Sequence, residues 1–275
     1  MIELLDGLSV EDCDGVRRHL DPSTIDAVSS KEIAARERYE RSLGGNEQAE
    51  LFDDVVRKAD FIKTFLDIRD RLRIEPGHRV LELGCGQGWA SALVKRYHPD
   101  AHVIASDLAV DGPRFAARYA QMLGTEIDER WSFDGRRMPF ADQTIDRVFA
   151  FAAFHHFGRD GDYREILTEV NRVLRVGGQA VLLYEPSSPE WLYRRAYKRV
   201  NRRQHLDGVH EDVLRPKQFR EIVSSLGGTL EIESYPQPRW RPGMTQTMYY
   251  QLLSRLPSPS KWLVSTINIR ITRGR

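Results

Sequence analysis

The stretch VLELGCGQGWA, residues 80 to 90, constrains the fold most, because it ends a short apolar run with three glycines at alternate positions. Glycines 84, 86 and 88 let the backbone turn tightly and approach a ligand without Cβ atoms in the way. The helix predicted next, near 89–97, would offer free N–H groups at its N-terminus to a polar or anionic ligand. The segment therefore predicts a strand, a ligand-binding turn and a helix.

The pattern around this loop predicts an α/β fold. Short apolar runs (RVLEL, HVIAS, DRVFAFA and QAVLLY) alternate with polar helical stretches between residues 79 and 185, which indicates a parallel sheet with crossover helices. Those helices are expected near 111–123 and 162–174, the second ending at VGG. Residues 24–74 carry apolar residues at helical spacing and predict two or three amphipathic helices. After Tyr184 we expect a turn in EPSSPE, a basic helix in YRRAYKRVNRR, a helix in RPKQFREIVSSLGG and an apolar-alternating TLEIESY.

Composition excludes several classes of protein. The chain has 275 residues, and 41 basic residues against 40 acidic ones give a formal net charge of +1, so it is not a polyanion binder as a whole. Cys13 and Cys85 cannot form a disulfide framework or a thiolate zinc site, which fits a reducing cytosol. The first residues lack the pattern of a signal peptide, and no apolar run approaches the roughly 18 residues of a membrane span. We therefore expect a soluble, cytoplasmic protein.

A carboxylate is expected beside the glycine loop. The run HVIASD ends in Asp107, where a ribose diol could donate two hydrogen bonds to it. This would suit both a nicotinamide dinucleotide and a methyl donor, and Asp107 could instead cap the following helix. The dinucleotide fingerprint would place a glycine at position 89, where this chain has Trp89.

Further motifs favour the methyl donor. FDGRRMPFADQTIDRVFAFAAFHHF, followed by ILTEVNRVLRVGGQAVLL, resembles in order and spacing the later motifs of class I S-adenosylmethionine-dependent methyltransferases of the type 11/25 kind. The resemblance runs from Arg79 to Tyr184, and more weakly into 209–228. It implies a Rossmann-like, doubly wound, mostly parallel seven-stranded sheet whose last strand is antiparallel. We expect a helical lid segment over 1–74 and the cofactor-binding domain over 75–275, with a cap insertion around 186–240.

The resemblance also implies cofactor contacts. Asp107 would bind the ribose with Leu108 on the adenine, and Asp134 would accept from the adenine amino group, helped by backbone at Gly135 and Arg136. Phe151 would mark where the chain meets the methionine amino group. Asp134 could instead close a loop, Glu82 could pair with a neighbouring group, and Val176 replaces the proline of the usual L-x-P-G-G. The residues expected at the methionine end are Glu82, Gly84, Cys85, Gly86 and Gly88.

The acceptor is less constrained. Alignment can supply much of the rate of methyl transfer, and a histidine base helps when the acceptor is a hydroxyl. His155, His156 and Glu185 are the candidate catalytic residues, with framework roles as the alternative; His205 and His210 lie in the predicted cap and are expected at the surface. The chain lacks the Asn/Asp-Pro-Pro-aromatic motif of amino-methylating nucleobase enzymes and the Cys-Pro nucleophile of cytosine methylation. No metal-ligand spacing is visible.

We therefore predict methyl transfer to a small molecule, favouring a hydroxyl of a natural product, a saccharide or a lipid-linked substrate. The alternatives are an RNA or protein methyltransferase, a non-catalytic cofactor-binding module and an NAD-dependent oxidoreductase. Oligomeric state stays open.

A basic run raises the question of a surface partner. The run lies within YRRAYKRVNRR, and Trp191, Tyr193 and Tyr197 accompany its basic residues. It is either a solvated helix or a surface that binds RNA phosphates, an anionic membrane or a phosphorylated substrate. The near-neutral chain places RNA below the small molecule. The tail LPSPSKWLVSTINIRITR either joins 191–203 at a membrane or packs on the sheet. The basic residues are Arg194, Arg195, Lys198, Arg199, Arg202 and Arg203.

Overall fold

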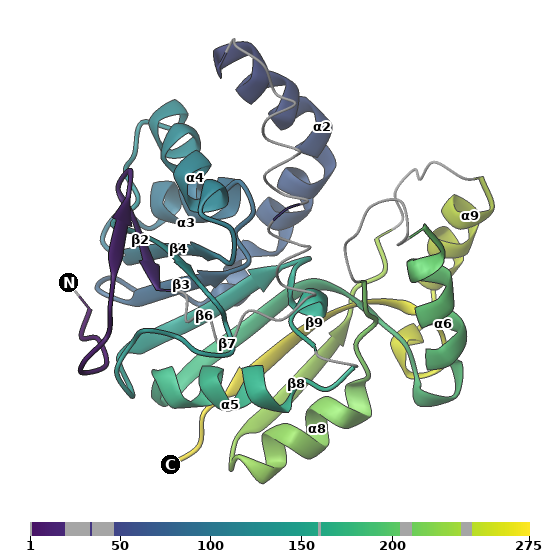
Figure 1. Ribbon diagram of the computed structural model, residues 1–275. Coiled ribbons are helices and arrows are strands. Elements are labelled where there is room, and N and C mark those ends of the chain that lie inside the picture. Colours follow the sequence, from purple (N-terminus) through teal and green to yellow (C-terminus); the bar gives the residue numbers. More distant parts are fainter. Residues whose placement is uncertain (1, 20–33, 35–46, 159–160, 204–210, 238–243) are drawn as a thin grey trace.

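A computed structural model describes residues 2–19, 34, 47–158, 161–203, 211–237 and 244–275. A central sheet has helices on both faces (Figure 1). The strands follow the order β1-β2-β5-β4-β3-β6-β7-β9-β8. Neighbouring strands from β2 to β7 in this order run parallel, whereas β9 is antiparallel to β7 and β8. The strands after the first two are β3 (Arg79–Leu83), β4 (His102–Asp107), β5 (Glu129–Phe133), β6 (Ile145–Phe151), β7 (Leu174–Ser187), β8 (Thr229–Ser234) and β9 (Ser265–Thr272).

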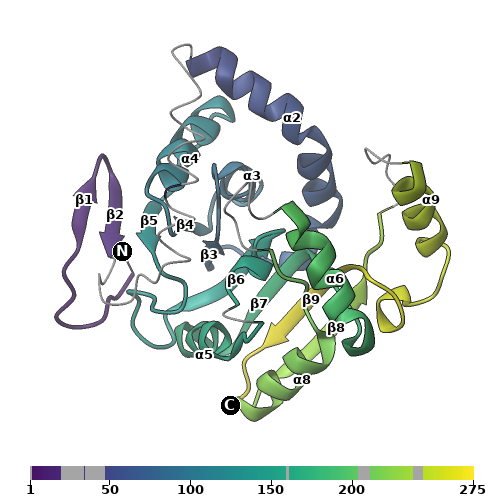
Figure 2. The same ribbon diagram turned by 45° about the vertical axis from the view of Figure 1, so that its right-hand side comes forward.

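The predicted fold class is confirmed, and the strand count is nine rather than seven. The additional strands are β1 (Glu11–Cys13) and β2 (Val16–His19), which form a hairpin beside β5 (Figure 2). Asp14 and Gly15 turn between them with φ of 55° and 76°. An Asp-Gly pair suits this two-residue turn because both positions need positive φ. Arg17 fixes the hairpin to β5 with an ion pair of 2.9 Å to Glu129.

The expected helical segment 1–74 is therefore not helical throughout. Helix α2 (Glu47–Ile68) and the short η1 (Arg69–Leu72) confirm helix in its second half. The expected helices over 24–46 fall almost wholly outside the described residues. In the part of the chain that the structure describes, no helix combines the length and apolar composition needed to cross a bilayer.

The crossover helices lie where the sequence predicts them. They are α3 (Trp89–Tyr97), α4 (Asp111–Met122) and α5 (Arg164–Val173). We had expected VGG to end α5. The helix instead ends before this motif, because β7 begins at Leu174 and includes both glycines. The turn expected in EPSSPE begins later for the same reason, since Glu185–Ser187 still belong to β7.

The C-terminal third supplies the remaining elements. β9 lies inside the sheet, so this part of the tail packs on the core and is not available to a membrane. No local pattern in the sequence predicted the helix α9 (Met244–Leu253). The elements after β7, apart from β8 and β9, are η3 (Glu190–Leu192), α6 (Tyr193–Val200), η4 (Asn201–Arg203), α8 (Pro216–Ser225), α9 (Met244–Leu253) and η5 (Pro259–Lys261).

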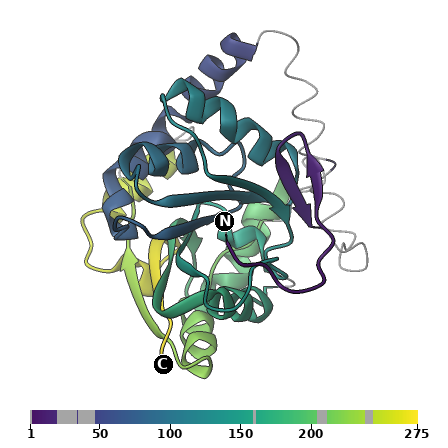
Figure 3. The same ribbon diagram turned by 90° about the vertical axis from the view of Figure 1, so that its left-hand side faces the viewer.

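Two hydrophobic layers fix the sheet. Phe65 of α2, Trp89 of α3 and Tyr119 of α4 pack on one face. Ile166 of α5 and Phe219 of α8 pack on the other. In Figure 3 the blue α2 lies above the sheet and the light-green α8 below it. This three-layer arrangement leaves the carboxyl ends of the parallel strands at one edge, where ligands bind in such folds.

Candidate cofactor and acceptor site

The glycine loop joins β3 to α3 at this edge. Gly84, Gly86 and Gly88 all have positive φ, of 68°, 52° and 74°. A Cβ on Gly88 would lie 2.1 Å from the Cβ of Ala116 in α4. The loop is thus pressed against a neighbouring helix, and only glycine fits at its last position.

Glu82 lies under this loop on β3. Its side chain accepts a hydrogen bond from the hydroxyl of Ser91, and the residue is 2% exposed. Burial raises the pKa of Glu82 to about 8, an effect that the hydrogen bonds from Ser91 oppose and the nearby charge of Asp107 reinforces. A buried carboxyl that holds its proton near neutral pH is suited to respond to a cation placed above it.

Asp107 ends β4 next to the loop, as predicted. Its carboxylate accepts hydrogen bonds from the backbone N–H groups of Gly86, at 2.8 Å, and Ala109, at 3.2 Å. Asp107 therefore fixes the shape of the glycine loop. Asp107 and Leu108 are both partly exposed.

Asp134 follows β5 and is held by Arg136. The Nε and Nη2 atoms of Arg136 donate to its two carboxylate oxygens at 2.9 and 2.7 Å, and the backbone N–H of Arg136 donates at 2.9 Å. A Cβ on Gly135 would lie 2.7 Å from the ring of Phe157. Asp134 thus closes a tight loop, and a contact to adenine would share its oxygens with Arg136.

Phe151 ends β6 within an aromatic cluster. Its ring stacks on Tyr184, with centroids 5.8 Å apart, and makes edge contacts with Trp89 and Phe65. Because the ring of Phe151 already packs against these three aromatic rings, the predicted cofactor contact at this residue would come from its backbone.

A bulge in β7 aims Glu185. The register with β9 shifts between Leu182 and Glu185, and Tyr184 has φ of 59°. The backbone N–H of Tyr184 donates to Oδ1 of buried Asn268, at 3.0 Å. A bulge turns the next side chain out of the regular alternation, and the carboxylate of Glu185 reaches the segment after β6.

Glu185 is fully buried and caps the short helix η2 (Phe154–His156). Its carboxylate accepts from the N–H groups of Ala153 at 3.0 Å, Phe154 at 2.9 Å and His155 at 3.2 Å. It also contacts Nδ1 of His155 at 2.8 Å. The carboxylate is saturated, which is incompatible with a role as base.

His155 lies between two carboxylates. Nδ1 faces Glu185, and Nε2 lies 3.0 Å from Oε2 of Glu211. Burial alone would lower the pKa of His155, but the hydrogen bonds to Glu185 and Glu211 outweigh it and raise this pKa to about 9. Both ring nitrogens are engaged, so His155 has no free lone pair with which to accept an acceptor's proton.

His156 is the less buried member of the pair. Its ring centroid lies 4.1 Å from that of His155, and the residue is partly exposed. The segment adjoins the glycine loop, because a Cβ on Gly84 would lie 3.0 Å from Ala153 and 3.3 Å from Phe157. The structure thus brings the predicted cofactor loop and the predicted catalytic segment together, whereas His205 and His210 lie outside the described residues.

Sequence reasoning missed the residues that hold the other side of this site. Glu211 follows the basic helix, and its backbone is fixed by Asn201, whose Nδ2 donates to the Glu211 carbonyl at 2.5 Å. Buried Asp212 accepts from the hydroxyls of Tyr163 at 2.8 Å and Tyr193 at 3.0 Å. The acidic pair in HEDV was the available sign of these residues. Their partners His155 and Tyr163 lie far away in the sequence.

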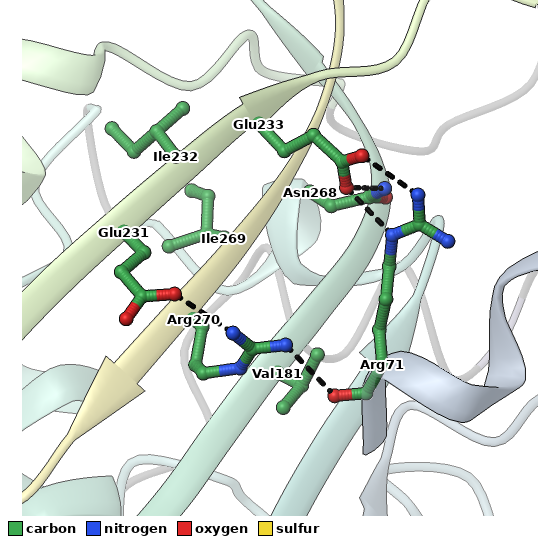
Figure 4. A pocket seen from close by; sticks show the side chains of 8 residues that line it. All are labelled: Arg71, Val181, Glu231, Ile232, Glu233, Asn268, Ile269 and Arg270. Atoms are coloured by element: carbon green, nitrogen blue, oxygen red, sulfur yellow. Dashed lines mark hydrogen bonds and ion pairs between the residues drawn. The ribbon is translucent and has the colours of Figure 1, made fainter. Parts of the chain in front are cut away.

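A cavity of about 190 Å³ lies elsewhere, between η1 and strands β7 to β9 (Figure 4). The ion pairs Arg71–Glu233, at 2.6 Å, and Arg270–Glu231, at 2.7 Å, line it. None of its lining residues belongs to the glycine loop or to η2. We assign no ligand to it, since its charges are already matched.

Comparison with known proteins identifies the domain. A family model described as a methyltransferase domain matches residues 80–178, from the strand before the glycine loop to VGG. Residues 80–178 thus form a methyltransferase domain, in a fold that solved methyltransferases bound to S-adenosylmethionine or S-adenosylhomocysteine share. Its cofactor is accordingly S-adenosylmethionine, and the NAD alternative is discarded.

Relatives of this methyltransferase differ in their acceptors. A demethylmenaquinone methyltransferase of Thermus thermophilus is 28% identical over 54% of this chain and 70% of its own length. A fatty-acid O-methyltransferase of Mycolicibacterium smegmatis is 35% identical, over 42% of this chain and 39% of its own. Geranyl diphosphate C-methyltransferase from Streptomyces coelicolor, solved with Mg²⁺, geranyl diphosphate and S-adenosylhomocysteine, has the same fold, with a TM-score of 0.57 and 14% identity over 84% of this chain and 85% of that one.

The residues of the methyltransferase domain fit the cofactor. The loop provides a cradle without side chains and the N-terminus of α3, while Asp107 presents a carboxylate at the sheet edge. Buried, protonated Glu82 lies where a positively charged amino group would favour its ionised form.

We predict that cofactor binding releases a proton from Glu82. At pH 7, below its pKa of about 8, the carboxyl is largely protonated, and a nearby ammonium lowers this pKa. Calorimetric titrations in buffers of different ionisation enthalpy should show release that approaches one proton at pH 7 and declines as the pH rises past 8. Glu82→Gln should abolish it, and a release that persists in this variant would contradict the assignment.

The same shift carries a stability consequence. The folded, cofactor-free domain holds the carboxyl proton of Glu82 more tightly than the unfolded chain does. Protonated Glu82 therefore contributes its full share of the free energy of unfolding below pH 4.5, its ordinary pKa. That contribution is lost as the pH rises through about 8.

Proposed function

We propose that the domain acts in the cytoplasm and transfers the methyl group of S-adenosylmethionine to a hydroxyl of a small molecule, in the class of natural products, saccharides and lipid-linked substrates. The close packing of Gly84 against Ala153 and Phe157 carries the proposal, because it puts the cofactor loop beside η2, which includes the partly exposed His156. The relatives named above act, by their names, on a quinone precursor, a fatty acid and a prenyl diphosphate.

We assign the cofactor to the predicted residues. Gly84, Gly86 and Gly88 would hold its methionine end over Glu82, with Cys85 inside the loop. Asp107 and Leu108 would bind the ribose and adenine, and Asp134 with Gly135 would close the adenine pocket. When bound, the cofactor supplies an activated methyl group on a sulfonium sulfur. The contribution of this chain is alignment, which can account for a large share of the rate.

The acceptor would lie between η2 and the described part of the predicted cap 186–240, which is residues 186–203 and 211–237. Glu185 and His155 serve as its framework, since their polar atoms are saturated within the protein. His156 is the predicted catalytic side chain that is partly exposed to an acceptor. Residues Glu47–Ile68 of the predicted lid connect to the loop through Lys58, whose Nζ donates to Oε1 of Gln87.

An acceptor screen tests this function. Formation of S-adenosylhomocysteine should appear with hydroxylated natural products and glycolipids and disappear when the hydroxyl is replaced by a methoxy group of the same skeleton. Mass fragmentation then places the added methyl on oxygen. Methylation confined to nitrogen, to carbon, or to RNA or protein would overturn the proposal.

We further propose that an anionic membrane presents the lipid-linked acceptor. Helix α6 exposes basic side chains, and α9 exposes Met244, Met248 and Leu252 at spacings of four residues, on one face. Both helices lie at the same end of the molecule in Figures 1 and 2. Trp191 and Trp262 are 70% and 69% exposed, as suits side chains at a lipid interface.

Vesicle sedimentation measures this interaction. The protein should pellet with phosphatidylserine-containing vesicles and stay in solution with phosphatidylcholine alone. Arg195→Gln with Lys198→Gln should weaken binding roughly 10- to 30-fold, since each basic residue near an anionic surface contributes about 1 kcal/mol. Lys217→Gln, an exposed lysine on α8, is the control. Equal sedimentation with both lipids, or an equal effect of the control, would contradict the proposal.

A further inference from the structure

A cluster of potential metal ligands lies between η2 and Glu211. Among the described residues, His155, His156 and Glu211 each bring one ligand atom into a group whose members lie within 4.8 Å of one another. A metal ion with ligands at about 2.0–2.2 Å needs such atoms about 3.3 Å apart in tetrahedral geometry. Nε2 of His155 and Oε2 of Glu211, 3.0 Å apart, are already near this spacing.

The surroundings of His155 match those of a metal-binding histidine. Such a histidine usually donates its second ring N–H to a carboxylate, which fixes the ring and its tautomer. Nδ1 of His155 lies 2.8 Å from Oε2 of fully buried Glu185. This orients Nε2 toward Glu211 and His156. Glu185 is itself held by three backbone N–H groups.

The opposite ligand, Glu211, has a fixed backbone, and its side chain is 41% exposed. Besides the bond from Asn201 to its carbonyl, the backbone N–H of Glu211 donates to Oδ1 of Asn201 at 3.2 Å. The next residue, Asp212, is 1% exposed and held by Tyr163 and Tyr193. The two halves of the cluster therefore come from rigid segments 55 or 56 positions apart, which is why no ligand spacing is visible in the sequence.

We propose that His155, His156 and Glu211 bind one divalent transition-metal ion. Two imidazoles and one carboxylate form a donor set that favours zinc, iron, cobalt or nickel over magnesium or calcium. The ion would displace the proton that Nε2 of His155 shares with Glu211. With both imidazoles then neutral, the carboxylates of Glu185 and Glu211 together balance the charge of a divalent ion.

Three protein ligands around such an ion would leave a coordination position for a small molecule. If the proposed O-methylation holds, an acceptor hydroxyl bound there would lose its proton more readily, so the metal would replace a protein base. Metal binding itself is independent of that function. It is tested without acceptor or turnover.

Cobalt titration of the full-length protein, after removal of bound metal with a chelator, tests the site. We expect saturable binding of one Co²⁺, visible d–d absorption of a four- or five-coordinate site, and displacement by one equivalent of Zn²⁺. His156→Gln and Glu211→Gln should each reduce the affinity at least 10-fold and alter the spectrum. His98→Ala, which removes a partly exposed histidine of the glycine-loop helix's C-terminus, should leave both unchanged.

Two results would overturn the inference. One is the absence of a saturable cobalt spectrum in protein that binds S-adenosylhomocysteine and is therefore folded. The other is a spectrum that His156→Gln and Glu211→Gln leave intact while both variants bind S-adenosylhomocysteine. Metal binding without any O-methylation would instead refute the proposed acceptor chemistry and leave the metal site standing.

Discussion

Replacing Glu185 with glutamine should lower the free energy of unfolding by roughly 3–5 kcal/mol, the usual cost of removing one partner from a buried ion pair. The carboxylate is fully buried and accepts three backbone N–H groups as well as His155. Glutamine has the same shape, but its NH₂ group would oppose a donor, and His155 would lose a compensating charge.

Denaturant unfolding at pH 7 measures this loss. Glu190→Gln is the control, because Glu190 also pairs with a basic group, Arg215 at 3.2 Å, but its side chain is 55% exposed. An exposed pair contributes about 0–1 kcal/mol. A loss of under about 1 kcal/mol in Glu185→Gln would mean that the carboxylate does not organise η2.

Gly88→Ala should destabilise the fold and weaken binding of S-adenosylmethionine. The new Cβ would lie 2.1 Å from the Cβ and 2.7 Å from the Cα of Ala116, and φ of 74° is unfavourable for alanine. Backbone strain costs about 1–2 kcal/mol and overpacking typically 1–3 kcal/mol more. Because α3 begins at the next residue, the displacement moves the N–H groups proposed to face the cofactor. We expect affinity to fall at least 10-fold in calorimetric titration.

Gly77→Ala separates strain from steric overlap. Gly77 has φ of 79°, but a Cβ there would meet nothing within 4 Å. Its destabilisation should be the smaller, and its cofactor affinity should stay normal. Ala116→Gly should partly rescue Gly88→Ala by removing the overlapping methyl group. Equal effects at the two glycines, or no rescue, would show that contact with α4 is not the cause.

Local sequence patterns predicted the elements whose formation depends on residues close together in the chain. The residues of β3 and α3 were found because an apolar run, a glycine turn and a helical period follow one another. β9 was read as a tail although STINIRIT alternates strongly. Its polar positions Thr266 and Asn268 are buried as well, so its two faces do not divide into core and solvent. The Asp14–Gly15 hairpin signal was overlooked beside a predicted helical segment.

The sequence could predict that these candidate residues lie near one another, but not the hydrogen bonds between them. His155 and Glu185 were selected as bases, but the structure pairs them and saturates their polar atoms. That pairing depends on Tyr184 at φ of 59°, a conformation that aromatic residues rarely adopt and that no local pattern announces. Glu211 escaped notice because its relation to His155 exists only after the cap segment returns to the sheet.

The position of β9 has a consequence for the order of folding. β8 forms the edge of the sheet and pairs with β9, which lies between it and β7. During synthesis, the edges of β7 and β8 that pair with β9 therefore keep unpaired backbone N–H and C=O groups until residues 265–272 have emerged from the ribosome. Such unpaired strand edges are sites of aggregation. A nascent chain stopped before Ser265 should accordingly depend on chaperones far more than one released after Thr272.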